Sequence, residues 1–177
     1  MKNTNAFSAK TLSLAGLMAA LIFVFTFTLK IPSPSGGYVH LGDGFILLSG
    51  FFLPPWEAIF SAAIGSTLAD VAGGYALYIP ATFVIKAIQC AIAYALCKSM
   101  KKTAPFSKSL PLRILLASIP AMVWMVFGYF LYEGLLLGWS AGIAALVGNI
   151  GQGVAGVVVA AILYYPFRKI IHSALEK

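Results

Sequence analysis

Six apolar stretches, separated by short segments rich in proline, glycine or polar residues, restrict what this chain can fold into. They cover residues 11–29, 44–53, 58–72, 81–96, 112–132 and 141–167. A helix that crosses a bilayer needs about 20 apolar residues, and most of the stretches approach that length. Only 10% of the residues are charged, against about 25% in a soluble domain. The sequence therefore predicts an all-α membrane protein, a compact bundle of six transmembrane helices that forms one domain over residues 1–177.

The second stretch is too short to cross a bilayer unaided. Residues 44–53 would cross only if they were tilted, shielded by neighbouring helices, or extended backwards through residues 38–43. The segment before them, residues 29–40, contains two prolines and two adjacent glycines, so it cannot be the interior of a helix. We expect it to be an external loop, long enough to fold over a cavity.

The basic residues fall into three groups along the chain. Lys2 and Lys10 precede the first stretch, a cluster within residues 98–113 lies between the fourth and fifth, and a third group within residues 168–177 follows the sixth. With six spans all three groups lie on one side of the membrane, and the other side carries only Lys30. By the positive-inside rule both termini are cytoplasmic. The net charge of +7 thus reflects topology and does not indicate a nucleic-acid partner.

Lys86 stands alone in an otherwise apolar segment, residues 75–89. A lysine at the centre of a transmembrane helix costs about 2.5–3.5 kcal/mol on insertion scales, so it usually faces a partner or a cavity. At 1.5 Å per residue, Asp70 lies roughly 6 Å below the Gly73-Gly74 break and Lys86 roughly 9 Å below Pro80. We therefore expect Asp70 and Lys86 to lie at similar depth and to pair, either as a structural ion pair or as part of a ligand site.

Polar and aromatic residues gather toward the outer half of the predicted bundle and indicate a small-molecule pocket. Asp43 either caps the second helix or lies at the cavity rim, and His40 is more typical of a loop histidine than of a ligand. The amides of Asn149 and Gln152 hydrogen-bond either between helices or to a ligand. No nucleotide-binding, zinc-protease or serine-hydrolase motif is present in the sequence. We expect no catalytic residue, no metal and no cofactor.

Helix 11–29 carries small residues four apart, Ala15 with Ala19 and Gly16 with Ala20. Such spacing lets another helix backbone approach closely. It serves either packing inside this bundle or docking of another subunit.

Three motifs together resemble those of a known family: GGYVHLGD at residues 36–43, GSTLAD at 65–70, and YIPAT at 78–82 followed by Ile85-Lys86. They are similar to those of the substrate-binding S component of energy-coupling factor (ECF) vitamin transporters, in the branch for hydroxymethylpyrimidine, pyridoxine or riboflavin. The resemblance extends over nearly the whole chain. His40 and Gln89-Cys90 depart from the pattern, since a small polar residue and a glutamate-glycine pair are more usual there.

The resemblance implies high-affinity capture of a vitamin, best matched by hydroxymethylpyrimidine or pyridoxine, with riboflavin as an alternative. The partners would be a transmembrane coupling subunit and two cytoplasmic ATPases in a bacterial cytoplasmic membrane, with Ala15 and Ala19 as the docking motif. An intramembrane enzyme and a self-sufficient secondary transporter are alternatives from other classes. The candidate substrate-binding residues are Tyr38, His40, Asp43, Asp70, Tyr78, Lys86, Gln89, Tyr129, Glu133, Trp139, Asn149 and Gln152.

Overall fold

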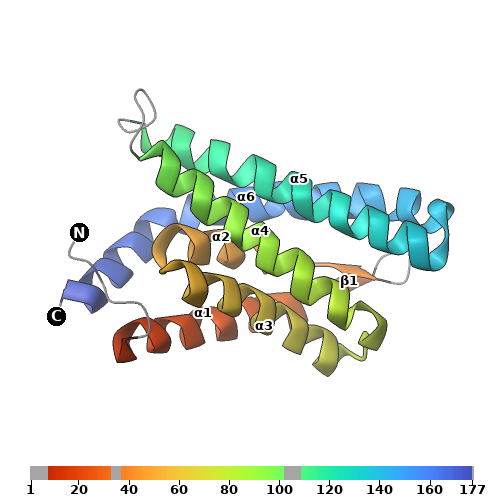
Figure 1. The fold of residues 1–177 in the computed structure, drawn as a ribbon, viewed down its shortest axis with the longest axis horizontal. Coiled ribbons are helices and arrows are strands. Elements are labelled where there is room, and N and C mark those ends of the chain that lie inside the picture. The colour runs from red at the N-terminus through yellow and green to blue at the C-terminus, as the bar shows by residue number, and fades with distance from the viewer. Residues whose placement is uncertain (1–7, 33–36, 102–108, 177) are drawn as a thin grey trace.

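The computed structural model describes residues 8–32, 37–101 and 109–176, and these are almost entirely helical (Figure 1). Within these ranges six α-helices follow one another, with a two-stranded hairpin after the first and a single 3-10 turn before the fourth. In order they are α1 (Ala9–Phe27), β1 (Ile31–Pro32), β2 (Tyr38–Val39), α2 (Asp43–Phe52), α3 (Pro55–Gly73), η1 (Ala76–Tyr78), α4 (Ile79–Met100), α5 (Leu110–Leu137) and α6 (Trp139–Glu176).

The helix boundaries follow local signals in the sequence. Ser8 caps α1, since its side chain accepts a hydrogen bond from the Thr11 backbone N–H at 3.2 Å, as expected of an N-cap serine. α3 ends at Gly74, whose φ of 78° is left-handed, a conformation that glycine adopts without steric cost. Gly138, with φ of 97°, separates α5 from α6. The chain reverses direction at these two glycines.

Four of the helical segments in the described ranges are long and apolar enough to cross a membrane: Ala9–Phe27, Ala76–Met100, Pro111–Leu137 and Trp139–Ile171. The chain is thus a multi-pass membrane protein. α2 has only 10 residues, and nine of them are buried. Of the three ways in which the short second stretch could be accommodated, the structure shows shielding by neighbouring helices. The backward extension through residues 38–43 does not occur, because Tyr38–Val39 pairs with Ile31–Pro32 in an antiparallel hairpin.

Four helices, α1, α3, α4 and α6, pack against α2. α5 packs along α6 and α1 packs along α3, while α4 lies between α3 and α5 (Figure 1). Glycines allow the closest approaches. A Cβ built on Gly65 of α3 would lie 2.5 Å from the Ala19 carbonyl oxygen of α1, and one on Gly44 of α2 would lie 2.4 Å from the Val159 side chain of α6. At both contacts the glycine backbone therefore packs directly against the neighbouring helix, with no room for a side chain.

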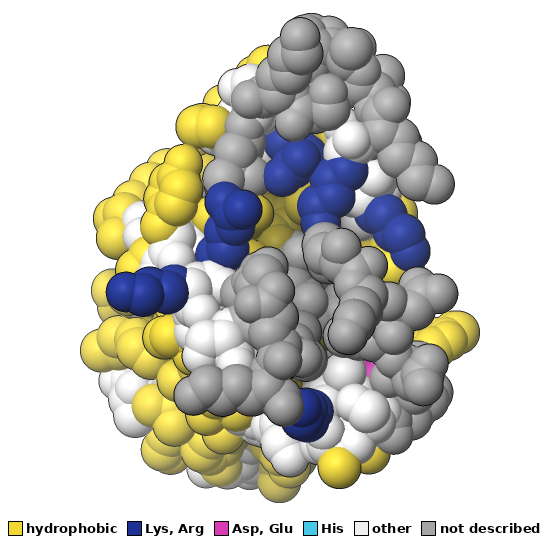
Figure 2. Space-filling model, turned by 90° about the vertical axis from the view of Figure 1, so that its left-hand side faces the viewer, with side chains coloured by type: hydrophobic (Ala, Val, Ile, Leu, Met, Phe, Trp, Pro, Cys, Tyr) yellow, Lys and Arg dark blue, Asp and Glu magenta, His cyan; other side chains and the backbone are white. Residues whose placement is uncertain are grey.

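The two ends of the bundle differ in charge. Lys and Arg side chains gather on the end of the bundle where α1 begins and α6 ends (Figures 1 and 2). They come from the start of α1, the end of α4, the start of α5 and the last part of α6: Lys10, Lys98, Lys101, Arg113, Arg168 and Lys169. Lys2, Lys102, Lys108 and Lys177 lie outside the described residues. Lys30, in contrast, lies over the Tyr75 ring, beyond the far end of α3.

Candidate functional site

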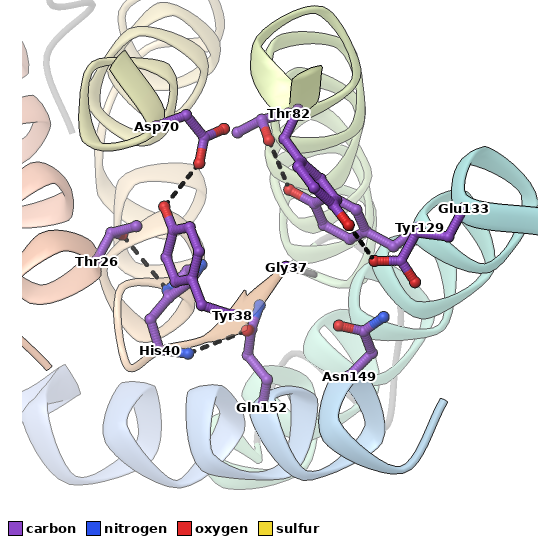
Figure 3. A pocket seen from close by; sticks show the side chains of 11 residues that line it. Thr26, Gly37, Tyr38, His40, Asp70, Thr82, Tyr129, Glu133, Asn149 and Gln152 are labelled. Atoms are coloured by element: carbon purple, nitrogen blue, oxygen red, sulfur yellow. Dashed lines mark hydrogen bonds between the residues drawn. The ribbon is translucent and has the colours of Figure 1, made fainter. Parts of the chain in front are cut away.

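A small polar cavity lies at the end of the bundle opposite the basic groups, where α1, the hairpin, α3, α4, α5 and α6 meet (Figure 3). Its volume is about 20 Å³, room for roughly one water molecule. A larger ligand can enter only when the lining side chains move apart. The lining residues are Thr26, Gly37, Tyr38, His40, Asp70, Tyr78, Thr82, Tyr129, Glu133, Asn149 and Gln152.

Tyr38 of β2 fastens the hairpin over this cavity. Its hydroxyl donates a hydrogen bond of 2.7 Å to Asp70 Oδ1 on α3, and its ring lies 4.5 Å from that of Tyr75, centroid to centroid. The Lys30 ammonium lies over both rings, 5.7 Å from the Tyr38 centroid and 5.4 Å from the Tyr75 centroid. Burial, and after it the nearby Asp70 charge, raise the pKa of Tyr38 above its ordinary value, so the phenol stays protonated and remains a donor.

Beneath the cavity, an ion pair joins α2 and α4. Lys86 Nζ lies 2.5 Å from Asp43 Oδ1, and both side chains are fully buried. The predicted pairing of Lys86 with Asp70 is therefore wrong. Asp43 does not cap α2 either, because Gly42 occupies the N-cap position. Its second oxygen, Oδ2, accepts a hydrogen bond of 2.7 Å from Gln152 Nε2 on α6. The pair thus holds three helices together.

This buried network continues to His40. The Gln152 side-chain oxygen accepts a hydrogen bond of 3.1 Å from the His40 backbone N–H. His40 Nδ1 in turn accepts the Gly42 N–H at 3.1 Å, so the ring proton is on Nε2. Burial, which disfavours the charged imidazolium, lowers the pKa of His40 to about 3. His40 is therefore neutral at physiological pH and forms part of the cavity wall.

On the other side, η1 and α4 each contact α5 through a hydroxyl group. The Tyr78 hydroxyl donates to Glu133 Oε1 at 3.0 Å, and the Thr82 and Tyr129 hydroxyls lie 3.0 Å apart. Lys86 Nζ also lies 5.4 Å from the centroid of the Tyr129 ring, within the range of a cation–π contact. The α5 wall is thus connected to the ion pair beneath the cavity.

Asn149 on α6 presents an unused donor in this wall. Its side chain is 8% exposed, and Nδ2 is buried without a hydrogen-bond partner in the described part of the chain. A buried polar group in that condition costs about 1–3 kcal/mol. A ligand acceptor beside Nδ2 would remove this cost.

Not every predicted site residue reaches the cavity. Asp43 and Lys86 lie beneath it. Gln89 is fully buried, with Nε2 3.4 Å from Met122 Sδ. Trp139 packs on Phe130, with ring centroids 5.7 Å apart, and is 52% exposed. The other eight predicted residues line the cavity: Tyr38, His40, Asp70, Tyr78, Tyr129, Glu133, Asn149 and Gln152.

Three lining residues were absent from the predicted set: Thr26, Gly37 and Thr82. Thr82 shares a helical face with Lys86, and this spacing is a signal that could have identified it. Gly37 lies close to the opposite wall, since a Cβ there would be 3.2 Å from the Tyr78 hydroxyl oxygen. Thr26 gives no local signal, because it lies in an apolar helix and reaches the cavity only through the packing of α1.

The small residues of α1 divide between two surroundings. The Ala15 carbonyl accepts a hydrogen bond of 3.0 Å from Ser61 Oγ on α3, and the Ala19 carbonyl faces Gly65. Gly16 is different, because a Cβ there would meet no atom within 4 Å. Ala15 and Ala19 therefore pack against α3 inside the bundle, whereas the surface at Gly16 is uncovered.

Comparisons with known proteins agree on one family. The family model for the S component of ECF-type riboflavin transporters matches residues 6–169. The chain is 32% identical over 158 residues to an uncharacterised protein of Pyrococcus woesei, covering 88% of this chain and 99% of that protein. It is 30% identical over 165 residues to the thiamine precursor transporter HmpT of Lactococcus lactis subsp. cremoris, covering 92% and 90% respectively.

A solved S component of a bacterial ECF transporter has the same fold. It superposes with a TM-score of 0.65 at 20% identity, over 92% of this chain and 97% of that one.

Proposed function

The chain belongs to the family of S components of ECF-type riboflavin transporters, and from that premise we propose that it captures hydroxymethylpyrimidine, a thiamine precursor. As an S component it is the substrate-binding subunit of a vitamin transporter and not an enzyme. The choice of substrate is supported by the relative named a thiamine precursor transporter and by the small, polar character of the cavity.

The observation that carries the choice of substrate is the unpaired side-chain nitrogen, Nδ2, of Asn149. A carboxamide has a donor and an acceptor side by side, and in nucleic-acid recognition it pairs with an amino group next to a ring nitrogen, as in adenine. Hydroxymethylpyrimidine carries an amino group beside a ring nitrogen. Asn149 Nδ2, which has no partner in the described protein, would donate to that nitrogen while Oδ1 accepts the amino proton.

The surrounding groups fit the same ring. Tyr38 and Tyr129 would lie against its faces, and Glu133 would accept a hydrogen bond from a heteroatom or hydroxyl group. Asp70 would shape the wall through its bond to Tyr38. Since the free volume is about 20 Å³, Tyr38 and the hairpin would have to move outward to admit even one ring. Pyridoxine, also a single ring, would need a smaller movement than riboflavin, which has three fused rings and a sugar-like chain.

Isothermal titration of the purified protein tests this assignment. Hydroxymethylpyrimidine should bind saturably with one site per chain, and Asn149→Leu should weaken binding by at least about tenfold, since an unpaired buried partner costs about 1–3 kcal/mol. Ser140→Leu, an exposed position on the same helix, is the matched control and should bind normally. Tighter binding of riboflavin or pyridoxine, or an unchanged affinity in Asn149→Leu, would contradict the proposal.

The energy for uptake would come from a coupling subunit and two cytoplasmic ATPases, with α1 as the docking helix. Gly16 lies in open space beside Ala15 and Ala19, so a large side chain there can block a partner without disturbing the fold. Gly16→Trp should abolish uptake by cells that contain the whole transporter and leave substrate binding by the purified chain unchanged. Gly151→Trp on α6, where a Cβ also meets no atom within 4 Å, is the control and should transport normally.

The proposed topology has six spans with both termini in the cytoplasm of a bacterium. Its support is the gathering of Lys and Arg side chains on one end (Figure 2), as the positive-inside rule requires. A membrane-impermeant maleimide should label Lys30→Cys in intact cells and Lys101→Cys only in opened cells. The reverse labelling pattern would show the opposite orientation in the membrane and would contradict the proposed topology.

A further inference from the structure

Lys30 lies where three segments of the chain meet beside the cavity. Its ammonium is 4.5 Å from the ring centroid of Phe27, at the end of α1, 5.7 Å from that of Tyr38, on β2, and 5.4 Å from that of Tyr75, between α3 and η1. All three distances are within the range of a cation–π contact. A Cβ on Gly73, the last residue of α3, would lie 3.1 Å from Lys30 Nζ. One ammonium therefore joins α1, the hairpin and the end of α3.

The cluster around Lys30 is partly screened from water. Lys30, Tyr38 and Tyr75 are each half-buried. An ammonium that has shed part of its water is attracted more strongly to an aromatic face than one in full solvent. Because Lys30 is attracted to Tyr38 and Tyr75 together, and their ring centroids lie 4.5 Å apart, its charge opposes separation of the two rings.

Tyr38 is the member of this cluster on which access to the cavity depends. Its hydroxyl donates to Asp70 on one side of the cavity (Figure 3), and two residues farther on the His40 backbone N–H donates to Gln152. The cavity has a free volume of only about 20 Å³, so Tyr38 has to move before a ring can pass. A contact that holds Tyr38 in place therefore also limits the passage of a ligand.

We propose that Lys30 is a positioning residue for substrate capture, whose positive charge holds Tyr38 against Tyr75 and so sets the rates at which a ligand enters and leaves. Lys30 is not one of the residues that line the cavity in the described ranges, so it acts through Tyr38. The proposal rests on the cavity assigned under Proposed function, but not on the identity of the vitamin. Lys30 also acts electrostatically on Asp70, and the experiments separate that effect from its attraction to the rings.

Hydrogen exchange of the purified, ligand-free chain, measured by mass spectrometry over residues 38–41, tests the role of the charge. This segment contains the His40 N–H that bonds to Gln152. Lys30→Met keeps a side chain of similar length without the charge, and it should speed exchange there by at least about fivefold. Lys30→Arg keeps the charge and should remain within about twofold of the wild type. Exchange of residues 45–51 in α2 should be the same in all three proteins.

Lys98→Met is the matched control. The Lys98 ammonium lies 5.2 Å from the Tyr94 ring centroid, a contact of the same kind on an exposed part of α4, and its loss should not affect exchange at residues 38–41. Equal exchange in Lys30→Met and the wild type would overturn the proposal. Equal acceleration in Lys30→Met and Lys30→Arg would also overturn it, because the charge would then not matter. Faster exchange in α2 as well would show that Lys30 stabilises the whole bundle, which contradicts a specific action on Tyr38.

Two double variants separate the rings from Asp70. Tyr75→Leu removes one ring, so in that background the effect of Lys30→Met should shrink by at least about twofold. Asp70→Asn removes the carboxylate charge but keeps an oxygen that can accept the Tyr38 hydroxyl, and in that background the effect of Lys30→Met should persist. A full effect with Tyr75→Leu and none with Asp70→Asn would show that Lys30 acts through Asp70, and would overturn the proposal.

Stopped-flow kinetics test the consequence for capture. With hydroxymethylpyrimidine, or with riboflavin if only riboflavin binds, Lys30→Met should accelerate both entry and release by at least about fivefold. The dissociation constant should change less than either rate, because Tyr38 has to move in both directions of passage. Unchanged rates would overturn the role of Lys30 in capture. If neither vitamin binds, the substrate assignment fails, whereas hydrogen exchange of the ligand-free chain still tests whether Lys30 holds Tyr38.

Discussion

Replacing Lys86 by methionine should leave Asp43 as an isolated carboxylate inside the bundle. Both side chains are fully buried and their charged atoms lie 2.5 Å apart. Within residues 8–32, 37–101 and 109–176, the only other hydrogen bond to the Asp43 carboxylate is the 2.7 Å bond from Gln152 Nε2. Removing one member of a buried ion pair costs about 3–5 kcal/mol, because the remaining charge loses its compensation. Asp43 could avoid a buried, unpaired charge by taking up a proton. For an ordinary aspartate at pH 7, however, protonation costs about 4 kcal/mol, so the expected loss of stability is similar either way.

The assay is unfolding of detergent-solubilised protein by added sodium dodecyl sulfate, followed by circular dichroism. Lys86→Met should lose about 3–5 kcal/mol, whereas Lys86→Met/Asp43→Asn, which is neutral again, should recover most of that loss. Lys98→Met on the same helix replaces an exposed lysine and should change stability by about 0.5 kcal/mol or less. If the single and double variants are equally unstable, the ion pair does not stabilise the bundle and the reasoning is refuted.

Three further predictions follow from individual contacts. Gly44→Ala would place a Cβ 2.4 Å from the Val159 side chain and should cost about 1–3 kcal/mol through overpacking, whereas Gly151→Ala in open space should cost almost nothing in the same assay. Tyr38→Phe removes the hydrogen bond to Asp70. Because such bonds to charged groups are worth about 1.5–3 kcal/mol, substrate release measured by stopped flow should accelerate by about tenfold or more. An unchanged release rate would show that this bond does not hold the hairpin closed. The pKa of His40 falls from 6.5 to about 3 on folding, so between these pH values only the unfolded state takes up the proton. The free energy of unfolding should therefore decrease as pH falls through that window, by at most about 1.4 kcal/mol per pH unit. His40→Gln should lack this contribution to the pH dependence of stability.

The helices could be predicted from the sequence because apolar runs and their proline and glycine boundaries are local properties. The predicted stretch 11–29 became Ala9–Phe27, and 81–96 became the longer Ile79–Met100. The sequence predicts only a loop where the structure has the hairpin. Its pairing of Ile31 with Val39 depends on how the ends of α1 and α2 are placed, which no local pattern encodes.

The partner of Lys86 could not be predicted by counting depth along neighbouring helices. That count compared α3 with α4 and favoured Asp70, but α2 occupies the centre of the bundle and brings Asp43 against Lys86. The position of a ten-residue helix along the bundle axis depends on tertiary packing, here on Gly44 and Gly156 against α6 and α2. Sequence alone gives no measure of that position.

The error at Trp139 has a different cause. A soluble helix reveals its buried face by the alternation of apolar and polar residues. In a membrane the lipid-facing side of a helix is apolar as well. The sequence therefore does not show whether an aromatic side chain near the outer end of a helix points into the bundle or toward lipid. Trp139 packs on Phe130 and is 52% exposed, whereas the amides of Asn149 and Gln152 face the cavity. Polar residues were therefore better guides to this site than aromatic ones.

The most direct test is the dissociation constant of the purified wild-type chain for hydroxymethylpyrimidine, measured by isothermal titration next to riboflavin. We predict saturable binding of one hydroxymethylpyrimidine per chain, at least tenfold tighter than the binding of riboflavin. Tight riboflavin binding with no measurable heat from hydroxymethylpyrimidine would contradict the account of the cavity as a site for a single polar ring.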